Sequence, residues 1–319
     1  MHHANIFSSV LKKIKNKQRN PNVLLLGEQN FTFAKSFTKN FPDTNVTATC
    51  FQENTAIESK DNLAVLGNID ATKLKEYKRF IDKPDLIVFN FPHVGGKSNI
   101  KNNRLLLKNF GRSASATYPL SGVILSLLAG QGGVDCSVER ESVKRRKMMD
   151  FEAKINTKPI IYGNTWQVQD KLGDNGYGLV DVREFPYDDF VEYKSSGYRN
   201  DRENQHNVRN SSFLNYGVSY EFWNEQNETM LDNIVYPRTF THDLSVNFNK
   251  SVNTEEINDH ILKNFDVVKS VECIDVWETY SKVSYTFRLV YSSKTIPLSP
   301  FRSLHFQNTK ILPKLLSNF

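Results

Sequence analysis

The sequence predicts an α/β protein in which a Rossmann-like, doubly wound sheet is followed by a smaller α+β domain. Strand and helix patterns alternate from residue 22 to about residue 180, which is typical of a parallel sheet with crossover helices. From residue 234 the order becomes strand, helix, strand, strand, helix. The chain has 319 residues, of which 39% are apolar, so each domain can bury a core of its own.

The first domain is expected over residues 22–233. "NVLLLG" at 22–27 is a buried strand run that ends at Gly27. Further strands are expected at 45–51, 64–70, 85–91, 122–130, 178–185 and 219–223, and helices at 31–41, 54–63, 102–118 and 165–177. Ligands of such sheets bind outside the carboxyl ends of the strands, so we expect the residues that follow the first four strands to lie close together.

Residues 134–163 break this alternation. They contain "KRRK" at 144–147, and we expect an inserted, basic and mobile segment. A charge run of this kind is either a solvated surface or a contact for nucleic acid, to which Lys144, Arg145 and Arg146 would contribute.

The second domain is expected over residues 234–319. "FTHDLSVNF" at 240–248 alternates between apolar and polar residues, as a half-buried strand does. Its other elements are expected to be a helix at 254–265 with Thr254 as its cap, strands at 267–278 and 282–293, and a final helix at 300–319. This order predicts a ferredoxin-like half-open sandwich without its last strand.

Residues 1–21 predict a basic N-terminal helix. Apolar side chains fall on one helical face, among several lysines, and no acidic residue precedes Glu28. A mitochondrial transit peptide has this pattern but more arginine, so a packed or RNA-facing helix is favoured. The apolar residues of this face are Ile6, Phe7, Val10, Leu11 and Ile14.

The bulk composition limits the classes of partner. A net charge of +6 favours a polyanionic partner, although solubility alone explains it equally well. Three scattered cysteines indicate a reducing compartment, and no Cys/His cluster predicts a metal site. No apolar run has the length of a bilayer crossing, so we expect no membrane span.

The turn after the first strand is a candidate nucleotide-type cofactor loop, because backbone amides and a helix N-terminus meet there. It consists of Gly27, Glu28, Gln29, Asn30 and Phe31. Only one of the expected glycines is present, which argues against a Rossmann dehydrogenase, and an ordinary tight turn explains Gly27 as well.

Polar residues also follow the second and third strands. Gln52 or Glu53 stands where an acidic group usually binds ribose hydroxyls. Asp70 would either accept from an adenine amine or cap the following helix.

The fourth strand ends in Asn90-Phe91-Pro92-His93. The amide of Asn90 can accept a hydrogen bond from a base N–H, Pro92 fixes the backbone, and His93 could take a proton. The alternative is a structural proline beside a loop histidine.

Six ordered blocks resemble the 25S ribosomal RNA uridine-N3 methyltransferase family over residues 22 to about 223. The blocks are "VLLLGEQNFTFAKSF", "GNIDATKL", "FNFPHVGGKSNIKNNRLLLKNF", "GQGG", "NTWQV" and "EYKSSGYRN". "YPRTFTHDLSVNF" and "VSYTFRLVYSS" resemble a ferredoxin-fold anticodon-binding domain, which phenylalanyl-tRNA synthetases also carry.

The resemblance implies a Rossmann-like methyltransferase that uses S-adenosylmethionine and acts on a base of tRNA or rRNA. It makes Gly27 to Phe31 the cofactor loop, Asp70 the adenine neighbour, and Asn90, Pro92 and His93 the acceptor motif. RNA phosphates would be held by Lys97, Arg104, Arg199 and the basic run at 144–147, while Tyr198 would stack a base.

A second interpretation is a catalytically inactive protein that binds RNA or assembles with protein partners. The family pattern has glycine where this chain has Gln29, and His242 stands where arginine is common. An RNA substrate implies a cytoplasmic or nucleolar location, and the N-terminal helix leaves a mitochondrial one open.

Overall fold

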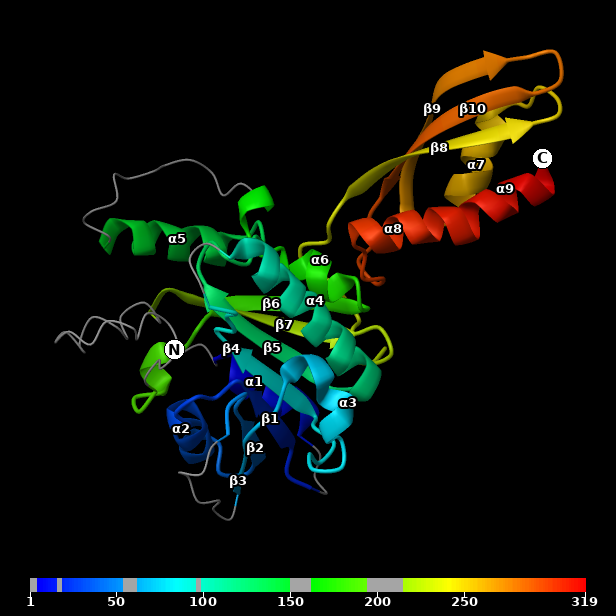
Figure 1. Ribbon diagram of the computed structural model, residues 1–319. Coiled ribbons are helices and arrows are strands. Elements are labelled where there is room, and N and C mark those ends of the chain that lie inside the picture. The colour runs from blue at the N-terminus through cyan, green and yellow to red at the C-terminus, as the bar shows by residue number, and fades with distance from the viewer. Residues whose placement is uncertain (1–4, 16–18, 54–61, 96–98, 150–161, 194–214) are drawn as a thin grey trace. The chain divides into compact units, whose positions relative to one another are not determined.

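The structure, a computed structural model, describes residues 5–15, 19–53, 62–95, 99–149, 162–193 and 215–319 (Figure 1). The chain divides into two compact units, Met1–Asp232 and Asn233–Phe319, each with its own hydrophobic core. The division falls within one residue of the boundary expected from composition.

The first unit contains a seven-stranded sheet in the order β3-β2-β1-β4-β5-β7-β6. Strands β1 to β5 are parallel, whereas β7 is antiparallel to both of its neighbours, β5 and β6. The sheet is therefore mainly parallel, and β7 returns in the antiparallel direction between β5 and β6. The strands are β1 (Asn22–Leu26), β2 (Asn45–Thr49), β3 (Leu63–Leu66), β4 (Leu86–Asn90), β5 (Gly122–Leu128), β6 (Tyr177–Glu184) and β7 (Gly217–Asn224).

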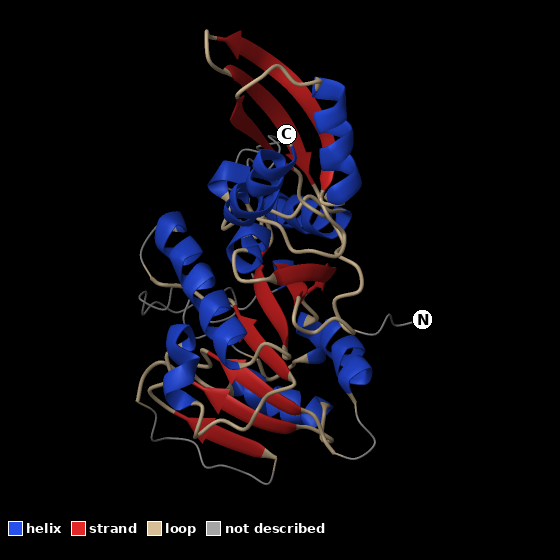
Figure 2. Ribbon diagram, turned by 90° about the vertical axis from the view of Figure 1, so that its right-hand side faces the viewer, coloured by secondary structure: helices blue, strands red, loops and turns tan. Residues whose placement is uncertain are grey.

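Helices cover both faces of this sheet (Figure 2). They are α1 (Ile6–Ile14), α2 (Thr32–Asn40), α3 (Leu74–Tyr77), α4 (Ile100–Thr117), α5 (Ser137–Met149) and α6 (Val168–Gly173). The predicted helix at 54–63 lies almost wholly outside the described residues.

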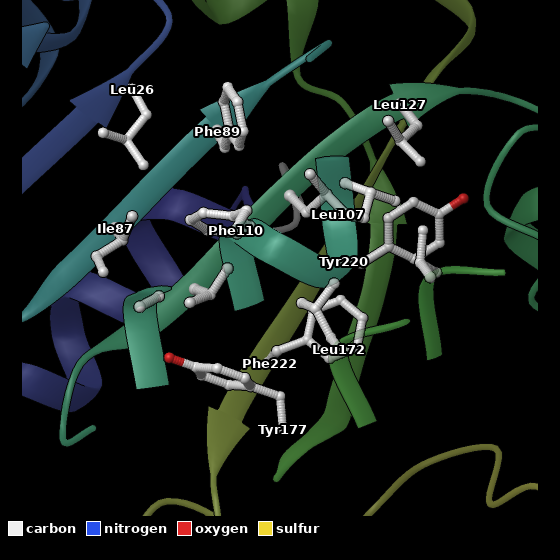
Figure 3. Close-up of a cluster of buried hydrophobic side chains, with 14 of the residues drawn as sticks. Leu26, Ile87, Phe89, Leu107, Phe110, Leu127, Leu172, Tyr177, Tyr220 and Phe222 are labelled. Carbon is white, nitrogen blue, oxygen red and sulfur yellow. The ribbon is translucent and has the colours of Figure 1, made fainter. Parts of the chain in front are cut away.

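One face of the sheet packs on α4 and α6 and forms the main core (Figure 3). Phe89 from β4 meets Phe110 from α4 at a ring-centroid distance of 5.1 Å. Tyr220 and Phe222 of β7 point to this same face because alternate residues of a strand do so. The intervening Glu221 must therefore face the opposite side of the sheet.

Helix α1 covers that opposite side. Lys13 of α1 reaches the fully buried Glu221, with 2.7 Å between Lys13 Nζ and Glu221 Oε1. The indole Nε1–H of Trp223 donates to the same oxygen, also at 2.7 Å. Phe7 packs in an aromatic cluster with Phe33, Phe37, Phe185 and Phe190. The apolar face read from the sequence is thus packed into the first unit.

Residues 137–149 form α5, which corrects the expectation of a mobile insertion there. The carboxylate of Glu139 is buried in this helix and binds the loop that follows β5. Its oxygens accept from the backbone N–H groups of Gly130, Gly133 and Val134, and from the hydroxyl of Tyr220. Residues 150–161 lie outside the described part of the chain.

The second unit is built around the antiparallel sheet β8-β10-β9. Its elements are β8 (Phe240–Phe248), α7 (Thr254–Asn264), β9 (Val268–Glu278), β10 (Val283–Tyr291), α8 (Pro300–Phe306) and α9 (Leu312–Asn318), with a π-helical turn, Gln307–Ile311, between the last two. Asn253, not Thr254, caps α7, because its Oδ1 accepts from the N–H of Glu255 at 2.9 Å. The element order matches the expectation, and assignment to the ferredoxin-like class stays a prediction.

Candidate functional site

The strand order of the first unit reverses at β1, which lies between β2 and β4. In sheets of this kind ligands bind at such a switch point, outside the carboxyl ends of the strands. Gly27 follows β1 and Asn90 ends β4, and the register pairs Leu26 with Phe89. The two positions are therefore neighbours at the same edge of the sheet.

At the end of β1 the backbone is accessible because Gly27 has no side chain. Gly27 is exposed with φ at +70°, and a Cβ there would lie 2.9 Å from Cε2 of Phe89. The position therefore requires glycine on two grounds, left-handed backbone and close approach. Phe31, at the start of α2, is also left-handed, with φ at 55°, and its ring is fully buried.

Glu28 points into the protein rather than toward the sheet edge. Its Oε2 accepts from the N–H of Ala34 in α2 at 3.3 Å. Burial raises the pKa of this carboxyl to about 8, since the charged form is poorly solvated, and the hydrogen bond opposes the shift only in part. The prediction that Glu28 contacts a cofactor is therefore corrected: its carboxyl group is buried and mostly protonated at neutral pH.

The other residues of the turn divide between the interior and the surface. Asn30 Oδ1 accepts from the N–H and the hydroxyl of Thr32, so this side chain orders the first turn of α2. Gln29 is exposed. Gly27 and Gln29 are thus the two members of the predicted loop that lie open at the sheet edge.

Asn90 has an unusual environment for an amide. It is only 8% exposed, and neither its Oδ1 nor its Nδ2 has a hydrogen-bond partner among the described residues. Its register partner Ser126 shares its own hydroxyl with Ser219 at 2.9 Å. A buried amide without partners costs roughly 1 to 3 kcal/mol, so it is expected where a ligand completes it.

The turn after Asn90 places the rest of the acceptor motif. Phe91 is left-handed, with φ at 47°, and Pro92 is buried. His93 is exposed, and its Nδ1 accepts from the N–H of Gly95 at 2.8 Å. The neutral ring therefore carries its proton on Nε2, and burial lowers its pKa. The role of His93 as proton acceptor stays a prediction.

The predicted site residues after β2 are exposed, whereas the one after β3 is hydrogen-bonded within the protein. Gln52 and Glu53 are exposed, beside a Phe51 side chain that is 71% exposed. Asp70 caps the short helix Ala71–Lys73, since its Oδ1 accepts from the N–H and hydroxyl of Thr72 at 2.8 and 2.7 Å. Of the two readings of Asp70, the structure shows the cap.

The cations predicted to hold RNA are mostly bound within the protein. Arg104 donates through Nε and Nη2 to the backbone carbonyl of Thr165, and through Nη2 to that of Gly163. The prediction that Arg104 contacts phosphate is thus corrected: its guanidinium group binds backbone carbonyls of the loop before α6. Lys97, Tyr198 and Arg199 lie outside the described residues.

The basic run on α5 is paired as well. Lys144 binds Glu141 at 2.7 Å, and Arg145 binds Glu184 at 2.6 Å. Arg146 donates to the carbonyl of Ala129 in the loop after β5. These contacts weaken the expectation that the run holds phosphates.

The loop after β5 was not among the predicted site residues. Gly130, Gly132 and Gly133 belong to it, and Cβ atoms on the last two would lie 2.1 Å from the hydroxyl oxygen of Tyr220 and 2.2 Å from that of Thr165. "GQGG" was the signal that could have located it, because closely spaced glycines indicate close backbone approach. Buried Glu139 holds this loop at the same sheet edge as Asn90.

The described residues contain neither a metal-binding cluster nor a membrane-spanning helix. No group of three or more His, Cys, Asp or Glu side chains is arranged to hold a metal ion. No helix there is long and apolar enough to cross a membrane.

Comparison with known proteins matches residues 24–197 to the family model described as BMT5-like, rRNA (uridine-N3-)-methyltransferase BTM5-like. The chain belongs to this family. Its fold is that of a Rossmann-like methyltransferase.

Curated relatives extend the comparison to animals. The mouse "Ferredoxin-fold anticodon-binding domain-containing protein 1 homolog" is 31% identical over 192 residues, which are 56% of this chain and 28% of that protein. Its human counterpart is 28% identical over 199 residues, 58% of this chain and 29% of that protein. The matched part thus spans less than a third of either relative.

Solved structures with a similar chain trace include the 16S rRNA methyltransferase KamB, at 11% identity and a TM-score of 0.39, covering 70% of this chain and 95% of that one. A fibrillarin/Nop5p complex matches at 14% identity and a TM-score of 0.35, covering 68% of this chain and 78% of that one.

Proposed function

We propose that the protein is an S-adenosylmethionine-dependent RNA methyltransferase whose acceptor base binds at the end of β4. The buried amide of Asn90 carries this proposal, because both of its polar atoms lack partners among the described residues, at the switch point of the sheet. Membership of a family described by rRNA uridine-N3 methylation supports the same reaction class.

The residues at the edge of the sheet suit the methyl donor. Gly27 offers exposed backbone without a side chain, and Gln29 beside it is exposed rather than packed inside. Gln52 and Glu53, exposed after β2, can accept from ribose hydroxyls. S-adenosylmethionine supplies an electrophilic methyl group on a sulfonium centre when it is bound.

Asn90 is complementary to the imide edge of a uracil ring. An amide has one oxygen that accepts and an NH₂ group that donates. As the ring binds, Oδ1 would accept from its N3–H group and Nδ2 would donate to a neighbouring ring carbonyl. The N3 proton would then pass to water, and the freed N3 lone pair would turn to the methyl group of the donor, which leaves as S-adenosylhomocysteine. A base reaching this buried side chain would leave its stack, as bases do in other enzymes that modify them. The chain then contributes mainly by positioning the ring.

Replacing Asn90 with alanine tests the assignment. The Asn90→Ala variant should bind S-adenosylmethionine as the wild type does in calorimetric titration, yet lose methyl transfer by about 100-fold or more. Transfer is measured with labelled donor on total RNA from cells that lack the protein, followed by mass spectrometry of nucleosides for 3-methyluridine. Since the amide is unsatisfied in the free protein, the variant should be no less stable than wild type.

Ser126→Ala is the matched control, because it removes the polar neighbour of Asn90 without removing an unpartnered group. It should retain most of the transfer. Undiminished transfer by Asn90→Ala would overturn the acceptor assignment. If the wild type does not bind S-adenosylmethionine at millimolar concentration, the proposal of an enzyme is overturned. A non-catalytic protein that binds RNA or assembles with other proteins would then be favoured.

A further inference from the structure

We propose that the stretch between β3 and β4, residues 73–83, is the surface that holds the phosphate backbone of the RNA. The proposal rests on the proposed function, for which it names a substrate-binding surface. We call this the α3 basic surface and define it by five cations: Lys73, Lys75, Lys78, Arg79 and Lys83.

The packing of this stretch explains why its charges face solvent. Leu74 and Ile81 are buried, and Tyr77 packs against the same core. Leu74 and Tyr77 share one face of α3, and Ile81 follows beyond the end of this helix. Three of the cations lie between these anchors, Lys73 and Lys83 flank them, and all five are exposed, together with the two anions Glu76 and Asp82.

The cations of the α3 basic surface have no anionic partner among the described residues. Across the described part of the chain, none of the five has an ion pair or a side-chain hydrogen bond. On α5, by contrast, Lys144, Arg145 and Arg146 each bind an oxygen of the protein. A phosphate contact at α3 releases counterions without breaking an internal bond, whereas one at α5 must replace existing partners.

An aromatic ring stands among these charges. Phe80 is 57% exposed, and Arg79 Cζ lies 4.5 Å from its ring centroid. An exposed ring bordered by cations is a platform on which a nucleic-acid base can stack.

Helix α4 connects this surface with the candidate site. In Figure 1, α3 and α4 lie side by side, and the N–H of Leu74 donates to Oγ of Ser113 in α4 at 2.6 Å. Lys101, in the first turn of α4, and Arg112, near Ser113, are exposed and also have no ion-pair partner in the described chain. Helix α4 begins just beyond the motif that Asn90 opens and passes α3 at Ser113, so it links the base site with the α3 basic surface.

The test compares two triple variants that lose equal charge. In the first, Lys75, Lys78 and Lys83 are replaced by glutamine. In the control, Lys263, Lys310 and Lys314 of the second unit, all exposed, are replaced by glutamine. The probe is a fluorescein-labelled RNA hairpin with uridines in its loop, and binding is followed by anisotropy from about 50 to 200 mM KCl. No methyl donor is present, so the result does not depend on turnover.

We expect the α3 variant to bind more weakly and to reduce the slope of log affinity against log salt by about 2, as for three lost phosphate contacts. Phe80→Ala should weaken binding without changing this slope, since stacking releases no counterions. The control should keep the wild-type slope. An unchanged slope in the α3 variant, or an equal loss in the control, would overturn the proposal. RNA affinity kept alongside absent methyl transfer would instead count against the proposed function.

Discussion

At the scale of single residues, the edge of the sheet holds two polar groups in unfavourable surroundings. Asn90 is buried without partners, and Glu28 is buried with one backbone donor. Asn90 ends β4 and Glu28 lies in the turn after β1, so both are at the switch point. Such groups cost stability, and proteins retain them where a site requires them.

Glu28 should make stability depend on pH. The folded protein keeps the proton of Glu28 up to about pH 8, whereas the unfolded chain loses it near 4.5. Between these values the folded state binds more protons, so the free energy of unfolding falls as pH rises, by at most about 1.4 kcal/mol per pH unit from this group. Urea unfolding of wild type and Glu28→Gln from pH 4 to 9 measures the difference. Parallel profiles for the two proteins would refute a raised pKa.

The sequence predicted the places of these residues in the fold better than the contacts of their side chains. Asn90 was expected at the end of a buried strand, and it is there. That His93 Nδ1 accepts from Gly95, and that Arg104 clamps the carbonyl of Thr165, depends on hydrogen bonds that no pattern of residue types encodes. The roles of these side chains follow from neighbours brought by the fold.

At the scale of elements, strands and helices were predicted well where their apolar residues recur with a clear period. The alternation at 240–248 defines β8 to the residue, because one face is buried and the other exposed. Helix α5 was missed because its inward side chains include Glu139 and Ser142, both fully buried. A helix with a polar inner face has no apolar stripe to detect.

The tie between α1 and β7 can be tested by a double-mutant cycle. Lys13→Ala should destabilise the protein by about 2 kcal/mol, because Glu221 stays buried with only Trp223 to donate. The loss falls short of a fully buried pair because the Lys13 side chain is 43% exposed. Adding Glu221→Gln should recover much of the loss in chemical denaturation. Additive losses in the cycle would mean that the two side chains do not interact.

At the scale of the whole molecule, the two units have separate cores. We therefore expect two unfolding transitions rather than one. Phe287 is fully buried in the second unit, and Phe287→Ala should cost that unit about 3 to 5 kcal/mol.

Differential scanning calorimetry separates the outcomes. The variant should move one transition to lower temperature and leave the other in place. A single cooperative transition that moves as a whole would show that the units unfold together. Phe110→Ala, in the core of the first unit, should give the reciprocal pattern.

The contact between Lys13 and Glu221 also affects the order in which the protein can be made. The two residues are 208 positions apart. Lys13 in α1 therefore leaves the ribosome long before β7, whose Glu221 pairs with its charge. At about 5 to 20 residues per second, this interval lasts roughly 10 to 40 s. During that time the apolar face of α1, including Phe7, also lacks Phe185 and Phe190. We therefore expect the apolar face of α1 to remain uncovered in the nascent chain until β7 emerges.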